Sequence, residues 1–267
     1  MAEADGRPVE ADGRPVLEIT GLTMSYAPPV PALDGVGLCC GAGECVAVLG
    51  ANGSGKSTLL RCAARLREPT AGTVRLRGED LTALRGARLR ERRRRIGLVL
   101  QSPALVGRRS ALANVAVGAL GRHRSPASQL GRWPRAEQAE AARCLHRVGM
   151  LELAHRRADT LSGGQAQRVA VARALCQRPL VLLADEPVAS LDPRAAHGVM
   201  TVLRGLAHED GLAVVVVLHQ PDLALPFADR VVGMRQGRVA FDLPSARVDR
   251  SRIALLYAAE RAERAGS

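Results

Sequence analysis

The chain has 267 residues, 47% of them hydrophobic, which excludes a disordered chain and allows a sizeable core within one domain. Its formal charge of +12 favours anionic partners, but arginine and alanine are abundant as in GC-rich coding sequences, so charge alone does not establish nucleic-acid binding. The longest apolar run, residues 212–218, is too short to cross a bilayer, and the acidic N-terminus does not resemble a signal peptide. The six cysteines lack paired two-residue spacing, which favours buried thiols in a reducing cytoplasm over a zinc site.

The first part of the chain predicts the order strand, loop, helix. Residues 3–16 are one heptapeptide, EADGRPV, written twice, and we expect residues 1–16 to form a disordered tail. LEITGLTMSY (17–26) then alternates as a strand does, and ECVAVLG (44–50) is an apolar run that ends in a glycine-rich loop. The next segment, STLLRCAARL (57–66), has the spacing of a helix.

The later segments predict a sheet covered by helices. Residues 73–100 mix strand-like pieces with RGARLRERRRR (85–95), which we expect to be a solvated helix or loop. Residues 102–160 are alanine-rich and helical in character, and they predict an inserted helical subdomain. PLVLLADE (179–186) and LAVVVVLH (212–219) are continuous apolar strands that end in polar residues, as strands of a covered parallel sheet do.

The glycine-rich loop GANGSGKS (50–57) fits the phosphate-binding template G-x-x-x-x-G-K-[ST], and it lies between a predicted strand and a predicted helix, as that template requires. Its glycines let backbone N–H groups turn towards phosphate oxygens, and the helix N-terminus adds partial positive charge. Lys56 is the only lysine of the chain. A compact ammonium on a slender stem fits where the planar fork of arginine would not, so we expect Lys56 to contact the β- and γ-phosphates of a nucleotide.

Three oxygen-bearing side chains complete the predicted catalytic edge. Ser57 is expected to place its hydroxyl on Mg2+, and Asp185, at the end of an apolar strand, to hold the same ion through its water shell. Glu186 follows immediately and is expected to polarise water for attack on the γ-phosphate, although a surface glutamate is the alternative.

LSGGQ (161–165) resembles the signature motif of the ATP-binding-cassette ATPases, and further motifs of that family occur in its order: Tyr26, Gln101, ADEP (184–187), SLD (190–192) and His219. The resemblance covers residues 17–245. It implies an α/β fold, a P-loop NTPase with a RecA-like parallel-sheet core, an antiparallel β subdomain and an inserted α-helical signature subdomain. The expected division is a single domain over 17–245, with its core at 17–100 and 166–245, a helical subdomain at about 101–165 and a C-terminal helical tail at 246–267.

The resemblance also implies roles for individual residues in a homodimer or pseudo-dimer. Ser162, Gly163 and Gly164 of one subunit would close over the γ-phosphate held by Lys56 of the other. Physically, a second helix N-terminus would then clamp the nucleotide from the opposite side.

Four further residues receive roles from the same resemblance. Gln101 would contact Mg2+ and the attacking water while sensing a membrane partner, and His219 would hold the γ-phosphate and orient Glu186. Asp192 would communicate across the dimer. Tyr26 would stack on adenine, with a core tyrosine as the alternative. The remaining aromatic residues are assigned to packing: Trp133, Phe227, Phe241 and Tyr257.

The predicted site therefore has three overlapping sets of residues. The catalytic residues are Glu186, His219 and Gln101, and the Mg2+-binding residues are Ser57, Gln101 and Asp185. The residues expected to bind ATP are Tyr26, Gly50, Asn52, Gly53, Ser54, Gly55, Lys56, Ser57, Thr58, Ser162, Gly163, Gly164, Gln165 and Asp192.

Two segments, ADEPVASLDP (184–193) and VVLHQPDLALPFADRVVGMRQGRVAFD (216–242), resemble the phosphonate-import subgroup more than amino-acid or sugar importers. This implies an ATP-hydrolysing motor subunit that drives uptake of phosphonate or a related phosphorus oxyanion. It would lie peripherally on the cytoplasmic face of the membrane, bound to integral membrane permease subunits and served indirectly by a periplasmic or lipid-anchored solute-binding protein.

Three other functions stay open at this point. One is an importer ATPase for another small solute, and another is a soluble cassette ATPase in a phosphonate-degrading complex or on nucleic acid, which the basic charge suggests. Relatives that act on DNA carry coiled-coil or zinc insertions, which do not appear here, so no nucleic-acid partner is expected. The third, a nucleotide-binding regulator without turnover, is disfavoured because Glu186 and His219 are both present.

Overall fold

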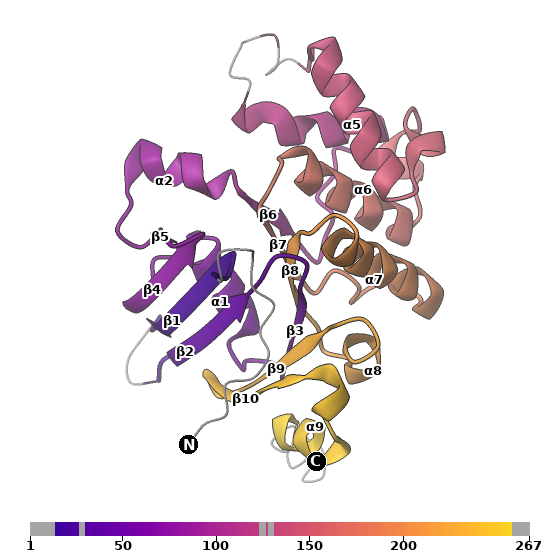
Figure 1. Ribbon diagram of the computed structural model, residues 1–267. Coiled ribbons are helices and arrows are strands. Elements are labelled where there is room, and N and C mark those ends of the chain that lie inside the picture. Colours follow the sequence, from indigo (N-terminus) through magenta and orange to yellow (C-terminus); the bar gives the residue numbers. More distant parts are fainter. Residues whose placement is uncertain (1–13, 27–29, 123–126, 128–130, 258–267) are drawn as a thin grey trace.

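The computed structural model describes residues 14–26, 30–122, 127 and 131–257, and it contains two β-sheets flanked by helices (Figure 1). Most of the tail expected at 1–16, and residues 258–267 of the expected C-terminal tail, lie outside the described residues. No helix within the described ranges combines the length and the apolar character that crossing a bilayer requires.

A six-stranded, mainly parallel sheet forms the centre, with strand order β10-β9-β3-β8-β7-β6. Only β10 runs antiparallel to its neighbour, at one edge. The strands of this sheet are β3 (Cys45–Leu49), β6 (Ile96–Val99), β7 (Val181–Asp185), β8 (Ala213–Val217), β9 (Arg230–Arg235) and β10 (Arg238–Pro244). The parallel-sheet α/β fold expected from the sequence is thus confirmed.

The second sheet is antiparallel and has four strands in the order β2-β1-β4-β5. Its strands are β1 (Leu17–Met24), β2 (Leu33–Cys40), β4 (Ala71–Leu76) and β5 (Glu79–Asp80). Helix α2 (Gly86–Arg93), which carries the arginine-rich run, lies beside this sheet and buries none of its own residues (Figure 1).

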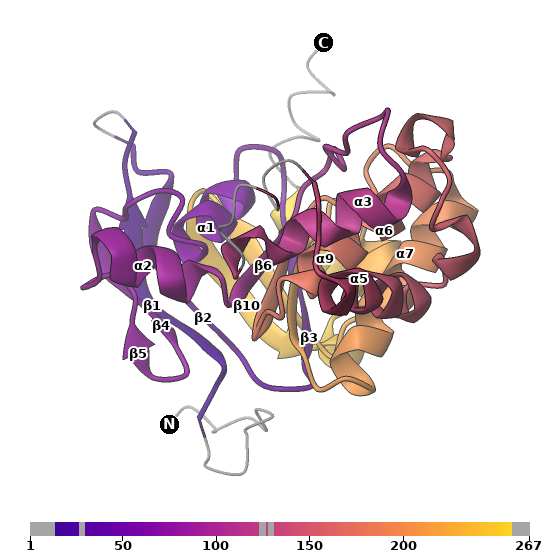
Figure 2. The ribbon, with the colours of Figure 1, turned by 90° about the horizontal axis from the view of Figure 1, so that it is seen from above.

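The helices that follow β6 gather on one side of the central sheet, opposite the antiparallel sheet (Figures 1 and 2). The α-helices there are α3 (Ala111–Ala116), α5 (Arg135–Arg147), α6 (Gly163–Cys176) and α7 (Pro193–His208). Short 3-10 turns join them: η1 (Val117–Gly121), η2 (Leu151–Leu153) and η3 (Ala158–Thr160). Further along the chain, α8 (Pro221–Ala224) precedes β9, and η4 (Ser245–Arg247) and α9 (Arg250–Leu256) follow β10.

The central strands separate two hydrophobic cores because their side chains alternate between the two faces of the sheet. In β7, Leu182 and Ala184 pack into the core beneath α3, α5, α6 and α7, whereas Val181 and Leu183 face the core shared with α1 (Lys56–Ala63) and the antiparallel sheet. Both faces are covered, which explains why these strands are continuously apolar in sequence.

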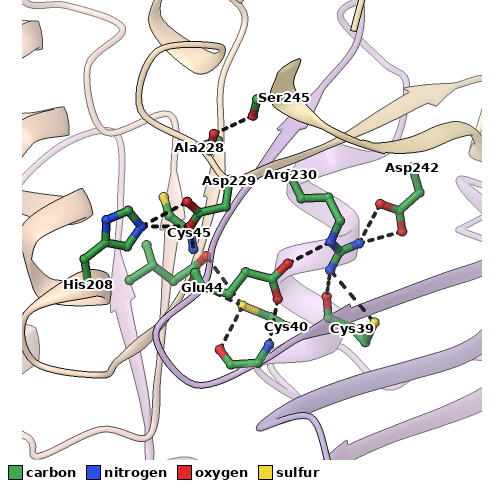
Figure 3. A network of polar contacts seen from close by, with 12 residues as sticks. Cys39, Cys40, Glu44, Cys45, His208, Ala228, Asp229, Arg230, Asp242 and Ser245 are labelled. Atoms are coloured by element: carbon green, nitrogen blue, oxygen red, sulfur yellow. Dashed lines mark hydrogen bonds and ion pairs between the residues drawn. The ribbon is translucent and has the colours of Figure 1, made fainter. Parts of the chain in front are cut away.

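A buried charge network joins the end of β2 to the last two strands (Figure 3). Arg230, at the start of β9, donates from Nε to Glu44 Oε1 at 2.7 Å and from Nη1 to both carboxylate oxygens of Asp242 at 2.5 and 2.6 Å, and it also donates to the carbonyl of Cys39. Burial alone would lower the pKa of Arg230, but hydrogen bonds and charge from Glu44 and Asp242 raise it, so the guanidinium stays charged. This network fixes the two sheets against each other.

Candidate functional site

Parallel strands bring the predicted site residues to one edge of the central sheet. β3 pairs with β8, and β8 pairs with β7, so the segments that follow all three strands meet where the strands end. The glycine-rich loop (50–57) follows β3, Glu186 follows β7, and His219 follows β8. This carboxyl edge is the usual place for ligands in open α/β sheets.

The loop between β3 and α1 needs glycine at both of its ends. At Gly50, a Cβ atom would lie 2.3 Å from the carbonyl oxygen of Met234. Gly55 has a φ of 101° and a Cβ there would lie 2.5 Å from the carbonyl oxygen of Ala32. The close packing of this backbone against its neighbours explains the spacing of the two glycines.

The ammonium group of Lys56 lies inside the loop. Its Nζ donates to the carbonyl oxygens of Gly50 at 2.7 Å and Ala51 at 2.8 Å, and it lies 3.5 Å from the hydroxyl of Ser54. Only 4% of Lys56 is exposed. The loop therefore holds one buried positive charge at its centre. Asn52 and Gly53 are exposed on the outer side of the same loop.

The hydroxyl of Ser57 donates to Asp185 Oδ1 at 2.8 Å, which joins the start of α1 to the end of β7. Asp185 is buried, and Ser57 is half-buried. Two oxygen ligands of the type that Mg2+ prefers thus lie next to the lysine of the loop.

Glu186 and His219 form a second pair at the same edge. The His219 Nε2 atom lies 2.5 Å from Glu186 Oε1, and both side chains line a small pocket of about 150 Å³. Glu186 has a φ of 49°, a left-handed conformation that is rare for a residue with a side chain, and its N–H donates to the carbonyl of Val217 at 3.2 Å. Such strained residues cluster at functional sites.

The signature segment begins α6 and is closed by a capping box. Ser162 Oγ accepts from the N–H of Gln165 at 3.4 Å, and the Ser162 N–H donates to Gln165 Oε1 at 3.0 Å. A Cβ at Gly164 would lie 2.8 Å from Ala195 Cβ, so this helix start packs closely on α7. The N-cap of α7 is Asp192, which accepts from the Ala195 N–H at 3.0 Å.

Hydrogen bonds and close contacts within the chain therefore divide the predicted residues into two groups. One group comprises Lys56, Ser57, Asp185, Glu186 and His219. The other comprises Ser162, Gly163, Gly164, Gln165 and Asp192, at the neighbouring starts of α6 and α7.

Tyr26 and Gln101 lie at the margins of the first group. Tyr26 is 55% exposed, which argues against a core tyrosine, and its hydroxyl lies 3.5 Å from Thr58 Oγ1 on the first turn of α1. Gln101 follows β6 with an exposed side chain, which makes no hydrogen bond to any other residue that the structure describes.

The sequence assigned Tyr257 to packing, and its ring does pack against the core beneath the helices. In addition, its hydroxyl donates to the backbone carbonyl of His219 at 2.9 Å, a contact that the sequence did not predict. The only feature of the sequence that could have drawn attention to Tyr257 is that the chain has just two tyrosines. The packing assignments of Trp133, Phe227 and Phe241 agree with the structure, where all three contact the core beneath the helices.

The arrangement suits phosphoryl chemistry. A buried ammonium within a loop of backbone amides favours a polyphosphate, and a hydroxyl beside a carboxylate suits a magnesium ion. A second carboxylate, in contact with an imidazole, is placed to act on water.

Comparison with known proteins agrees with this chemistry. The family model described as ABC transporter matches residues 33–189, which is more than half of the chain. Over 232 residues the chain is 50% identical to the phosphonates import ATP-binding protein PhnC of Nocardia farcinica, covering 87% of this chain and 86% of the relative. It is also 50% identical over 226 residues to the phosphate-import ATP-binding protein PhnC of Mycolicibacterium smegmatis, covering 85% and 86% respectively.

A solved structure shares the same architecture. This is a dimeric ATP-binding cassette in a post-hydrolysis state bound to ADP and Pi, with a TM-score of 0.74, 32% sequence identity, and coverage of 86% of this chain and 98% of that chain. The chain therefore belongs to the ABC transporter family, as one of its ATP-binding cassettes.

Proposed function

We propose that this chain is the ATP-hydrolysing motor subunit of an importer for phosphonate or a related phosphorus oxyanion. The observation that carries the ATPase part is the meeting of Lys56, the Ser57–Asp185 pair and the Glu186–His219 pair at the carboxyl edge of one sheet. The solute class rests on two relatives at 50% identity, of which one is named for phosphonates and the other for phosphate.

The first group of residues binds the nucleotide. Phosphate oxygens displace the loop carbonyls from the Lys56 ammonium, and the amides of residues 50–58 surround the β-phosphate. The exposed ring of Tyr26 stacks on the adenine, close to Thr58.

The residues also fit a magnesium ion. Ser57 Oγ and Asp185 Oδ1 are both oxygen ligands and lie within one hydrogen bond of each other beside the loop, and Gln101 completes the set from the segment after β6. Ser57 would hold such an ion directly and Asp185 would hold it through its water shell. When bound, the ion would supply positive charge that offsets the charge developing on the phosphate oxygens.

Glu186 and His219 carry the hydrolytic step. Glu186 accepts a proton from the attacking water. His219 orients the Glu186 carboxylate and holds the γ-phosphate. The second group of residues acts in trans within a homodimer, where Ser162, Gly163 and Gly164 of the partner subunit bring a helix N-terminus to the same phosphate. Hydrolysis removes the clamped group and lets the dimer open.

The permease binds in this proposal at an open pocket of about 470 Å³ between α2, β6 and the helical subdomain. Apolar Leu66 and Leu98 and the basic Arg90, Arg93 and Arg94 line this pocket, and Leu66 is exposed. A pocket lined by both apolar and basic side chains suits an amphipathic segment of a membrane protein that carries acidic residues.

Solute uptake tests the proposal. Cells that lack this chain should lose uptake of a labelled phosphonate, and wild-type chain, but not Glu186→Gln, should restore it. A parallel assay with labelled phosphate identifies the oxyanion that the system takes up. Unchanged uptake of both oxyanions in the deletion strain would remove the solute class, while ATP hydrolysis by the purified chain would test the motor independently.

A further inference from the structure

Tyr257, the last residue that the structure describes, lies at the catalytic edge. After β10 and η4 the chain forms α9, which packs on β9 and buries Leu256 to 1% exposure in the core beneath the helices. Ile253 and the ring of Tyr257 pack partly buried against the same core. A side chain at the end of α9 is therefore held at a fixed place next to the segment that follows β8.

Tyr257 contacts that segment at His219. Its hydroxyl donates to the His219 backbone carbonyl at 2.9 Å across 38 positions of sequence. Leu218 is tied to β3 by its N–H, which donates to the Val48 carbonyl at 3.1 Å, and Gln220 begins α8 by accepting from the N–H of Leu223. Within the described ranges, no backbone N–H donates to the carbonyl of His219. Tyr257 thus satisfies an acceptor that neither β8 nor α8 satisfies.

His219 is consequently held at two points. Tyr257 fixes its backbone from the C-terminal helix, and its imidazole Nε2 contacts Glu186 Oε1 on the other side. Loss of the hydrogen bond from Tyr257 would free the His219 main chain to shift, and a shift of its Cα would move the attached imidazole relative to the Glu186 carboxylate.

We propose that Tyr257 is a positioning residue for ATP hydrolysis, through which α9 sets the placement of His219 on Glu186. This inference rests on the proposed ATPase function and extends it to the C-terminal segment, which carries no motif of its own. Tyr257 does not touch the nucleotide in this proposal. Its hydroxyl acts on the hydrolytic step alone, while its ring contributes to packing.

The chain contains a second hydrogen bond of the same kind, remote from the catalytic edge, which provides a matched control. Ser245 in η4 donates its hydroxyl to the carbonyl of Ala228, so it is also a C-terminal hydroxyl that binds a distant backbone carbonyl (Figure 3). Ala228 does not belong to the catalytic edge. Removing either hydroxyl deletes one hydrogen bond between the C-terminal segment and the body of the protein.

The experiment compares full-length wild type, Tyr257→Phe and Ser245→Ala in steady-state ATP hydrolysis over a range of ATP concentrations, with melting temperatures measured in parallel. Tyr257→Phe keeps the ring, so we expect this variant to fold. Loss of one hydrogen bond that positions His219 should lower kcat about 3- to 10-fold. The KM for ATP should be unchanged. Ser245→Ala should keep the wild-type kcat even where its melting temperature falls.

Two results would overturn the inference: a Tyr257→Phe chain with wild-type kcat, or equal losses of kcat in Tyr257→Phe and Ser245→Ala that follow their melting temperatures. The failure of the underlying function has a different signature. In that case the wild-type chain and Glu186→Gln would show the same turnover, and the inference would fall together with the ATPase assignment.

Discussion

The imidazole Nε2 of His219 lies 2.5 Å from Glu186 Oε1, although the two residues follow different strands and stand 33 positions apart. β7 and β8 are direct neighbours in the sheet, so the contact is a product of their parallel register, in which Asp185 pairs with Val217. In the proposed mechanism, a carboxylate held in this way is oriented before any nucleotide binds, which would lower the free energy needed to reach the transition state.

Replacing Glu186 with glutamine should remove the proton acceptor while preserving size. We expect ATP binding to be retained and hydrolysis to fall by about 10²–10⁴-fold, the range of general-base catalysis. With ATP bound and uncleaved, the dimer should persist, which size-exclusion chromatography in the presence of ATP would detect. Glu209→Gln, an exposed glutamate at the end of α7, is the control, and equal turnover in both variants would refute the role of Glu186.

Replacing Lys56 with arginine tests why the chain contains a single lysine. The ammonium fits between the Gly50 and Ala51 carbonyls within 2.8 Å, whereas a planar guanidinium with five donors is broader and would push the loop open. We expect ATP affinity to fall by about tenfold or more, equivalent to about 1.4 kcal/mol, in a fluorescent-nucleotide titration. Arg61→Lys, an exposed exchange on the same helix, should leave affinity unchanged, and tight binding by Lys56→Arg would show that charge alone suffices.

Replacing Tyr26 with alanine should weaken nucleotide binding without slowing hydrolysis at saturation. An exposed aromatic ring that stacks on a base contributes about 1–3 kcal/mol, so KM for ATP should rise at least fivefold while kcat stays near wild type. Tyr26→Trp, which retains an aromatic face, should restore KM. An unaltered KM in Tyr26→Ala would mean that adenine lies elsewhere.

Replacing Arg230 with methionine should destabilise the fold. The change leaves Glu44, only 2% exposed, as a buried carboxylate without its cation, and breaking such a pair costs about 3–5 kcal/mol. Urea unfolding measures this loss. Arg238→Met removes an ion pair with Asp34 in which the arginine is 72% exposed, so it should cost less than about 1 kcal/mol, and equal losses in the two variants would contradict this account of the network.

Much of the fold follows from local sequence, because continuous apolar strands and the glycine-rich loop each admit few structures. The α/β class and the strand-loop-helix unit around Lys56 are confirmed. The roles of the site residues stay predictions. Their positions in the structure, however, agree with the chemistry expected for Ser57, Asp185, Glu186 and His219.

Other features leave no pattern in a single sequence. Arg230 is one of many arginines in a chain with an arginine-rich composition, and only the folded structure shows that it is buried among carboxylates. Tyr257 reads as an ordinary packing aromatic, because periodicity does not reveal which distant carbonyl a hydroxyl meets. The left-handed backbone at Glu186 likewise depends on how β7 and β8 meet, since glutamate has no local preference for it.

The left-handed backbone at Glu186 links the stability of the fold to the proposed catalytic role of this residue. Glycine would adopt the φ of 49° freely and relieve about 1–2 kcal/mol of conformational energy, but it has no carboxylate. In the proposed mechanism, glycine at position 186 would therefore give a more stable chain that does not hydrolyse ATP. The left-handed backbone is the conformational cost of placing a carboxylate at this position.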